Sequence, residues 1–394
     1  MIPAAPFLSN RFSRRAPGAG ALRLAVRAGR EARARAALAP RRRGRGPMAV
    51  FLPAGPPQGA ALLRIYNVAE ALRPLGWRTA VLPSKLTLAG RRRYLAAARP
   101  DIVVMQGVRH ALNRPALYPG VPIVFDIDDA DFHLDRFAGP MREAMGGVTS
   151  VVAGSRYIAE WCRENGAPEA RVIWTGTPVS PAGGPAHAAR PPVVAWAQTR
   201  PGAYHREAAL VARVMAGVAA RRPGVTLRLY DRRAGDDPAF VDRFRAPGLA
   251  VEWWKACPYR DYLDSFGDVA VGLAPLCPET PFSRGKSFGK VLAYLDRGVV
   301  VVGSDAGEHG AFFTGETGVI TDDEAAWVDG IVRLLDAAAI RQEIAGAARE
   351  CFAARLSVAA AAAGMADVLA SRAGGLRGPW SPGCLPRSVR AGWF

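Results

Sequence analysis

Short apolar runs alternate with segments of helical periodicity along residues 48–370, and this alternation limits the possible folds more than any other feature. Parallel strands that are buried on both faces have this appearance, because they carry few polar residues and need a helix to return the chain. The pattern therefore predicts an α/β fold with helices on both faces of parallel sheets. The expected strands are residues 49–53, 79–82, 101–105, 121–125, 150–153, 172–174, 193–197, 226–230, 250–254, 268–273 and 299–303.

The alternation stops once, between residues 178 and 192. Five prolines and the pair Gly183 and Gly184 interrupt any regular element there, so this segment is expected to be a linker. A chain of 394 residues is also long enough for two domains. We expect two doubly wound α/β domains over residues 48–177 and 193–356, followed by an Ala-rich helix at 357–371. In such sheets ligands bind beyond the carboxyl ends of the strands.

The formal net charge of +18 is concentrated at the two ends of the chain. Residues 1–47 contain twelve arginines and one acidic residue, while residues 371–394 contain four arginines and no acidic residue. We expect residues 1–47 and 372–394 to be disordered, with Met48 as an alternative start. Two other interpretations of residues 1–47 are an Arg-rich transit peptide and an arm that binds anionic lipid or nucleic acid. The body between them is nearly neutral, so a specific nucleic-acid partner is not expected.

Cysteine and histidine usage argues against two further classes of protein. The five cysteines are scattered and form no C-x-x-C, which favours reduced thiols and disfavours a zinc module. The five histidines show no spacing typical of metal ligands. No uninterrupted apolar stretch is long enough to predict a transmembrane helix. We therefore expect no metal and no cofactor.

Four carboxylates follow the expected strand that ends at residue 125. They lie at positions 126, 128, 129 and 131, and their mutual repulsion requires a cation, a basic partner or raised pKa values. Asp128 or Asp129 could act as a general base that accepts a hydroxyl proton. Alternatively, Asp126 and Asp128 could serve a metal-dependent phosphatase, although Ala130 replaces the usual Thr or Val. The simplest alternative is a solvated loop that caps a helix.

Three further loops contain residues suited to an anionic ligand. Gly55 and Gly59 lie between the first strand and its helix, where the backbone can approach a ligand, although a tight turn explains them equally well. Arg200 and His205 lie between the first strand and helix of the second domain, where surface arginines are also common. The third loop carries a basic cluster that suits a diphosphate or, alternatively, caps a helix at the surface: Arg284, Lys286, Ser287 and Lys290.

Residues 269–305, VAVGLAPLCPETPFSRGKSFGKVLAYLDRGVVVVGSD, resemble the glycosyltransferase group 1 superfamily of bacterial, nucleotide-sugar-dependent enzymes. Residues 315–319 are similar to the G-x-T-G-x-L turn of that superfamily, residues 125–131 to its D-x-D-D-D stretch, and residues 172–178 to its V-I-P-N-G-V strand. The resemblance implies a GT-B fold, in which two Rossmann-like domains face a cleft and the last helix crosses back. It places the acceptor on the first domain and the donor on the second. The donor-binding residues that it implies are Arg200, His205, Arg284, Lys286, Ser287, Thr317 and Gly318.

The chain departs from the family pattern at two positions. Gly285 and Ala293 occupy the places of two glutamates that many members carry eight residues apart. This departure leaves two functional alternatives besides the phosphatase. The chain is expected to transfer a sugar from a nucleotide sugar to the hydroxyl of a glycan or lipid-linked acceptor, in cell-envelope or exopolysaccharide synthesis. Alternatively, it binds a sugar nucleotide or glycan without turnover. The expected location is the cytoplasm, with peripheral contact at the inner membrane face as a further expectation.

Overall fold

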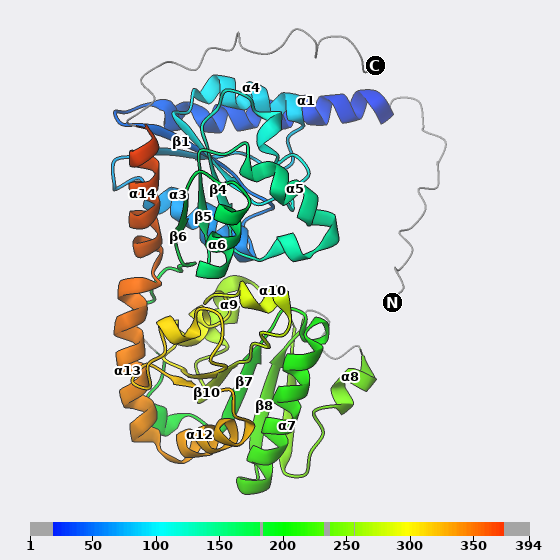
Figure 1. Ribbon diagram of the computed structural model, residues 1–394, viewed down its shortest axis with the longest axis vertical. Coiled ribbons are helices and arrows are strands. Elements are labelled where there is room, and N and C mark those ends of the chain that lie inside the picture. The colour runs from blue at the N-terminus through cyan, green and yellow to red at the C-terminus, as the bar shows by residue number, and fades with distance from the viewer. Residues whose placement is uncertain (1–18, 182–183, 232–236, 256, 374–394) are drawn as a thin grey trace.

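The computed structural model describes residues 19–181, 184–231, 237–255 and 257–373. Two six-stranded parallel sheets, each covered by helices, lie one above the other in Figure 1. The predicted fold class, two doubly wound parallel-sheet units, is therefore confirmed. Across this described part of the chain, every helix is too short or too polar to cross a lipid bilayer.

The first sheet has the strand order β2-β1-β3-β4-β5-β6, and every neighbouring pair is parallel. Its central strands are mostly apolar and fully buried, because helices cover both faces. The strands are β1 (Met48–Leu52), β2 (Arg78–Val81), β3 (Ile102–Gln106), β4 (Ile123–Ile127), β5 (Ser150–Ala153) and β6 (Ala170–Val172). The helices are α2 (Gly59–Ala61), which continues through a π-helical turn (Leu62–Tyr66) into α3 (Asn67–Ala71), then α4 (Leu88–Ala98), α5 (Asp135–Met145) and α6 (Arg156–Glu164).

The second sheet repeats this arrangement in the order β12-β11-β10-β7-β8-β9, again with parallel pairs only. Its strands are β7 (Val193–Ala197), β8 (Val225–Tyr230), β9 (Leu249–Trp254), β10 (Val271–Ala274), β11 (Val300–Gly303) and β12 (Val319–Ile320). Its helices are α7 (His205–Arg221), α8 (Pro238–Asp242), α9 (Tyr259–Asp264), α10 (Pro281–Arg284), α11 (Leu292–Asp296), α12 (Glu324–Asp336) and α13 (Ala338–Arg355). Sequence periodicity predicts a helix over 288–296, but regular α-helix begins only at Leu292.

The chain returns to the first sheet at its end. Helix α14 (Val358–Ala373) follows α13 along one side of the molecule and packs beside α3 (Figure 1). Its apolar face joins the core beneath the first sheet through residues such as Met365 and Leu369, which are fully buried. At the junction, Thr177 pairs with Ser357 in an isolated parallel bridge. The last helix thus ties the two sheets together.

The leader differs from the prediction. Helix α1 (Ala19–Arg42) covers α4, so the expectation that residues 1–47 are disordered is wrong for this segment; residues 1–18 lie outside the described residues, as do 374–394 of the predicted tail. Leu38 and Ala34 are buried in the first core, and Glu31 accepts hydrogen bonds from Arg93 at 2.7–3.0 Å. A composition rich in Arg and Ala conceals this helix, because its buried apolar side chains among the described ones are those of Ala34 and Leu38.

Candidate active site

The carboxyl ends of the two sheets meet through a direct ion pair. Lys286, in the loop after α10, donates from Nζ to Oδ1 of Asp129 at 2.5 Å. Asp129 lies in the loop that follows β4, and the Lys286 loop follows β10, so each residue comes from the carboxyl end of a central strand. This is the edge at which doubly wound sheets bind ligands.

Arg109 holds two of the carboxylates in place. Its Nε and Nη2 donate to the two oxygens of Asp131, both at 2.7 Å, and Nη2 also donates to Asp129 at 2.6 Å. Paired hydrogen bonds of this kind fix a carboxylate in one orientation. Burial lowers the pKa of Arg109, but its bonds to Asp131 and the charges of the carboxylates outweigh this effect and raise it.

Asp126 belongs to a separate, buried pair. Both of its oxygens accept hydrogen bonds from Arg64 at 2.8 Å, and the two side chains are only 1% and 3% exposed. Arg64 also donates to Thr175 and to the carbonyl of Ile173, each at 3.0 Å. Asp126 is thus fully engaged in holding the end of β4 against the segment that leads to the second sheet. Such a carboxylate is poorly placed to be the nucleophile of a phosphatase.

Asp128 and Asp129 are adjacent, but their pKa values are shifted in opposite directions. Burial, followed by the charge of Asp129, raises the pKa of Asp128 from its ordinary value of 3.8 to about 7. Burial also acts to raise the pKa of Asp129, but Lys286 and Arg109 outweigh it and lower the value to about 2. Within the described residues Asp128 has no hydrogen-bond or ion-pair partner. Two carboxyl groups whose pKa values are driven apart commonly have different chemical roles, and Asp128 has the properties of a base.

The segment from Arg284 to Lys290, called the basic loop below, lies against the loop that follows β7. Lys290 donates to the hydroxyl of Thr199 at 2.8 Å, and Nζ of Lys286 lies 4.4 Å from the ring centroid of Phe282. Burial and the nearby charge of Lys286 lower the pKa of Lys290 to about 8. Two ammonium groups that repel one another form a site that an anion would stabilise.

Gly285 explains one of the missing glutamates. A Cβ atom at this position would lie 2.7 Å from Cβ of Ala130 and 3.3 Å from Cγ1 of Ile158. Both residues belong to the part of the chain that forms the first sheet, called the first half below; the part that forms the second sheet is the second half. A side chain cannot be accommodated here without moving the two halves apart. Ala293 is also buried, at 3% exposure, in α11. The two positions are therefore packed in apolar surroundings.

The remaining predicted residues are divided between exposed positions and structural ones. Arg200 precedes a short 3-10 turn and His205 begins α7; both are exposed, as is Arg284, which donates to the carbonyl of Pro278 at 2.8 Å. Ser287 is half-buried in the basic loop. On the first half, Gly55 is half-buried, and Gly59 begins α2 with a φ of +53°, a value that favours glycine.

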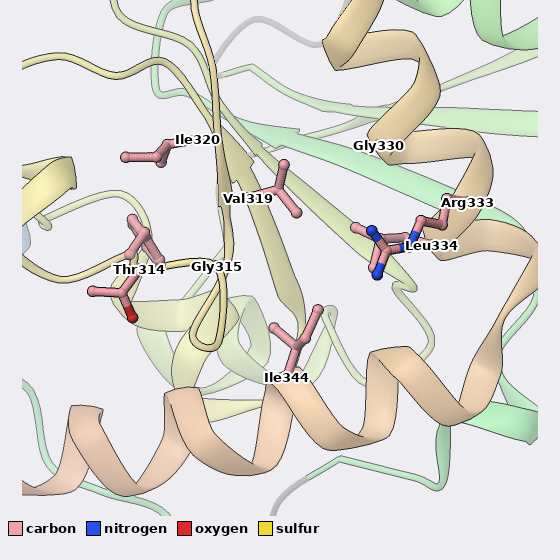
Figure 2. A pocket seen from close by; sticks show the side chains of 9 residues that line it. Thr314, Gly315, Val319, Ile320, Gly330, Arg333, Leu334 and Ile344 are labelled. Carbon is pink, nitrogen blue, oxygen red and sulfur yellow. The ribbon is translucent and has the colours of Figure 1, made fainter.

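Thr317 and Gly318 have roles within their own turn. The Thr317 hydroxyl donates to the carbonyl of Phe312 at 2.6 Å, and a Cβ atom at Gly318 would lie 2.5 Å from the ring of Phe313. A nearby pocket of about 410 Å³ is bordered by neither residue. Figure 2 shows that side chains of β12, α12 and α13 approach one another there: Val319, Leu334 and Ile344. This pocket lies at the edge of the second sheet.

Four residues at or near the junction do not stand out in the sequence. Arg64 and Arg109 pair with the acidic segment from distant positions, and Gln106 is the last residue of β3. Glu308 accepts from the backbone N–H of Arg156 at 2.8 Å and from the indole of Trp174 at 2.9 Å, which links the two halves. Gln106 and Arg109 could have been noticed because they come just after the strand expected at 101–105. No sequence signal indicates Arg64 or Glu308.

Comparison with solved structures places this architecture among known folds. No protein-family model and no curated protein matches the chain. Sucrose-phosphate synthase from Thermosynechococcus elongatus is 14% identical with a TM-score of 0.65, covering 84% of this chain and 100% of its own. The chain has the GT-B fold. A glycosyltransferase from Rickettsia africae is 11% identical with a TM-score of 0.60, covering 84% of this chain and 99% of its own.

A further similar structure is HepE from Anabaena, solved in complex with UDP and glucose. It is 15% identical with a TM-score of 0.58, covering 82% of this chain and 100% of its own. The similarity agrees with the GT-B fold that the motif at 269–305 implies. At these identities it extends to the fold and no further, so the chemistry of the chain must be argued from its own residues.

Proposed function

We propose that this protein transfers a sugar from a nucleoside diphosphate to an acceptor hydroxyl at the junction of its two sheets. The observation that supports this proposal most directly is the Lys286–Asp129 pair. It places a cation from the second half beside carboxylates from the first half, at the carboxyl ends of both sheets. Sugar transfer needs both, because a base must accept the acceptor proton while a cation stabilises the leaving diphosphate.

In this proposal Asp128 is the base. The acceptor hydroxyl transfers its proton to the Asp128 carboxylate as the acceptor oxygen bonds to the anomeric carbon of the donor sugar. The bond from that carbon to the diphosphate breaks, and the diphosphate leaves with the bonding electrons. A pKa near 7 gives Asp128 a useful affinity for the proton and leaves a large share of the group ionised at neutral pH.

The basic loop receives the charge of the leaving group. Lys286 and Lys290 carry the ammonium groups, Ser287 supplies a hydroxyl, and Arg200 and Arg284 lie at exposed positions in the same loops. Charge develops on the diphosphate as the sugar bond breaks, so fixed cations lower the barrier to transfer. Asp129, with a pKa of about 2, is a weak base and acts instead by holding Lys286 and Arg109 in place. HepE, with UDP and glucose bound in the same fold, supports a donor of this class.

A second candidate function is binding without turnover. It is favoured by the apolar packing at Gly285 and Ala293, where the family pattern has carboxylates. A protein of this kind would bind a nucleotide sugar or glycan and release no nucleoside diphosphate.

A donor panel separates the two functions. The full chain is incubated with nucleotide sugars of different bases and sugars, with and without a mixture of acceptors, and release of nucleoside diphosphate is measured. The proposal predicts release with at least one donor, a loss of roughly 100-fold or more in Asp128→Asn, and unchanged release in the exposed control Lys85→Ala. Tight donor binding without release by any donor would support the binding protein and contradict the transferase.

A further inference from the structure

A cavity of about 230 Å³ opens beside the carboxylates of the first half. It lies between the loop after β1, the end of β3 and the loop after β4, and its polar lining includes Gln58, Gln106, Arg109, Asp128, Asp129 and Asp131. We refer to it as the β1–β3–β4 pocket. It is smaller than the roughly 300–1,000 Å³ of pockets for drug-sized ligands, and its size suits a single sugar ring.

Gln106 provides this pocket with a hydrogen-bond donor that has no partner in the protein. The side chain is 4% exposed, and its Oε1 accepts the backbone N–H of Ala54 at 2.9 Å. That bond fixes which end of the amide is left over. Nε2 has no hydrogen-bond partner within the described residues, but it is not completely enclosed by protein atoms. Since Gln106 lines the pocket, Nε2 is accessible from it. A buried amide N–H that lacks a partner requires an acceptor atom from a ligand or water.

Asp128 supplies the complementary acceptor. It lines the same pocket and has no hydrogen-bond or ion-pair partner within the described residues. A hydroxyl group can accept a hydrogen bond from Gln106 and donate one to Asp128, whereas an aliphatic group can do neither. The pair therefore favours a ligand rich in hydroxyl groups.

The charge of the lining restricts the ligand further. Three carboxylates line the pocket, those of Asp128, Asp129 and Asp131, whereas Arg109 is the one cation among the described residues that line it. Lys286 adds a second positive charge through its ion pair with Asp129. Two of the three guanidinium nitrogens of Arg109 already donate to Asp129 and Asp131, and Lys286 is paired with Asp129. Above about pH 7, where Asp128 is ionised, a phosphate or carboxylate entering this pocket would meet a net negative charge.

We propose that the β1–β3–β4 pocket binds one ring of an uncharged or amino-substituted sugar, with Gln106 as a specificity-determining residue, and that it rejects phosphorylated and carboxylated sugars. Gln106 donates from Nε2 to a hydroxyl oxygen of the ring, and Asp128 accepts from a neighbouring hydroxyl. The description of this ring as the acceptor rests on the proposed function, whereas the binding itself does not.

Binding measured without any donor tests the inference. Titration of the full chain by NMR uses neutral hexoses, their 2-amino forms, their 6-phosphates and the corresponding uronic acids. We expect at least one neutral or amino sugar to bind, and its 6-phosphate and uronic acid to bind at least tenfold more weakly. Gln106→Leu should weaken binding of the neutral sugar by roughly fivefold or more. The matched control is Gln342→Leu, since Gln342 is exposed on α13 and likewise accepts a backbone N–H through Oε1; it should leave binding unchanged.

The outcomes distinguish this inference from the proposed function. Equal or tighter binding of the phosphorylated or carboxylated sugars would overturn it, and so would the absence of binding by every neutral and amino sugar at high millimolar concentration. Neither result would affect release of nucleoside diphosphate in the donor panel. Conversely, Gln106-dependent sugar binding in a chain that turns over no donor would uphold the pocket and refute the transferase. In Asp128→Asn, the discrimination against anionic sugars should narrow, because one negative charge is removed.

Discussion

Nζ of Lys286 lies 2.5 Å from Oδ1 of Asp129, and this ion pair joins the loop after β10 to the loop after β4. The cation that is proposed to receive the donor diphosphate is thus already held by a carboxylate of the first half. A diphosphate must therefore compete with Asp129 or share Lys286 with it. The pair couples the two halves of the site, because a change at either residue alters the charge that the other half meets.

The acid limb of the pH profile should belong to Asp128. Its pKa is raised to about 7, and a base must be ionised to accept a proton. We expect kcat/KM to fall by roughly tenfold for each pH unit below about 7 and to level off above it. Initial rates from pH 5 to 9 with a turned-over donor measure this. A profile that is flat through pH 6 would show that another group is the base.

Asp128→Asn should also stabilise the fold at neutral pH. A carboxyl group with a raised pKa binds its proton more tightly in the folded state, so its contribution to stability decreases as pH rises from about 4 to 7. Asparagine removes this effect, and we expect the melting temperature at pH 7.5 to rise by a few degrees, with little change at pH 4. A lower melting temperature at pH 7.5 would contradict the buried, like-charged surroundings of Asp128.

Gly285→Ala should disturb the contact between the two halves. The added Cβ would lie 2.7 Å from that of Ala130, and overpacking of this kind costs about 1–3 kcal/mol. Gly289→Ala is the matched control in the same loop, because a Cβ atom there meets nothing within 4 Å. We expect thermal unfolding to report a clear loss for Gly285→Ala and little for the control. Gly285→Glu, which restores the family residue, should lower activity; an increase would mean that the halves separate in the working enzyme.

Arg64→Ala should be among the most destabilising single changes. It leaves Asp126 buried without its partner, which costs about 3–5 kcal/mol. Arg245→Ala removes an ion pair with Asp242 whose side chains are well exposed, and such pairs contribute about 0–1 kcal/mol. Urea unfolding of the two variants tests this contrast. Equal losses would show that the Arg64–Asp126 pair is not desolvated as described.

The strand–helix alternation was sufficient to predict the fold, whereas much of the site depends on contacts that are distant in sequence. Ten of the eleven expected strands coincide with observed strands, because a short apolar run is a local signal, whereas the strand expected at 172–174 lies earlier, at Ala170–Val172. Among the strands of the described residues, only the two-residue β12 was not predicted. The pairing of Asp129 with Lys286 joins positions 157 residues apart, and no local pattern specifies it.

Side-chain roles were harder to predict than positions. The four carboxylates do lie together, but their sequence gives no indication that Asp126 is buried against Arg64 while Asp128 has no ion-pair partner within the described part of the chain. Thr317 and Gly318 match a family turn, yet their contacts are with Phe312 and Phe313. The helix at 19–42 was missed because its composition is that of a disordered, basic segment.

The N-terminal helix should contribute to stability. Leu38 is 1% exposed in the first core, and Leu→Ala at a buried position costs about 2–5 kcal/mol. Leu75→Ala is the matched control, since Leu75 is 49% exposed. We expect the melting temperature to fall by several degrees for Leu38→Ala only. Equal melting temperatures would show that the helix does not pack on the core in solution.

The affinity for a nucleoside diphosphate tests the central claim most directly. Isothermal titration of UDP, GDP and ADP into the full chain should show binding of at least one of them. For that nucleotide, Lys286→Ala should raise Kd by roughly 10- to 100-fold, which corresponds to loss of a charged hydrogen bond of about 1.5–3 kcal/mol. Lys286→Arg should retain part of the affinity, and Lys85→Ala should bind as the unmodified chain does. An unchanged Kd in Lys286→Ala would contradict the account.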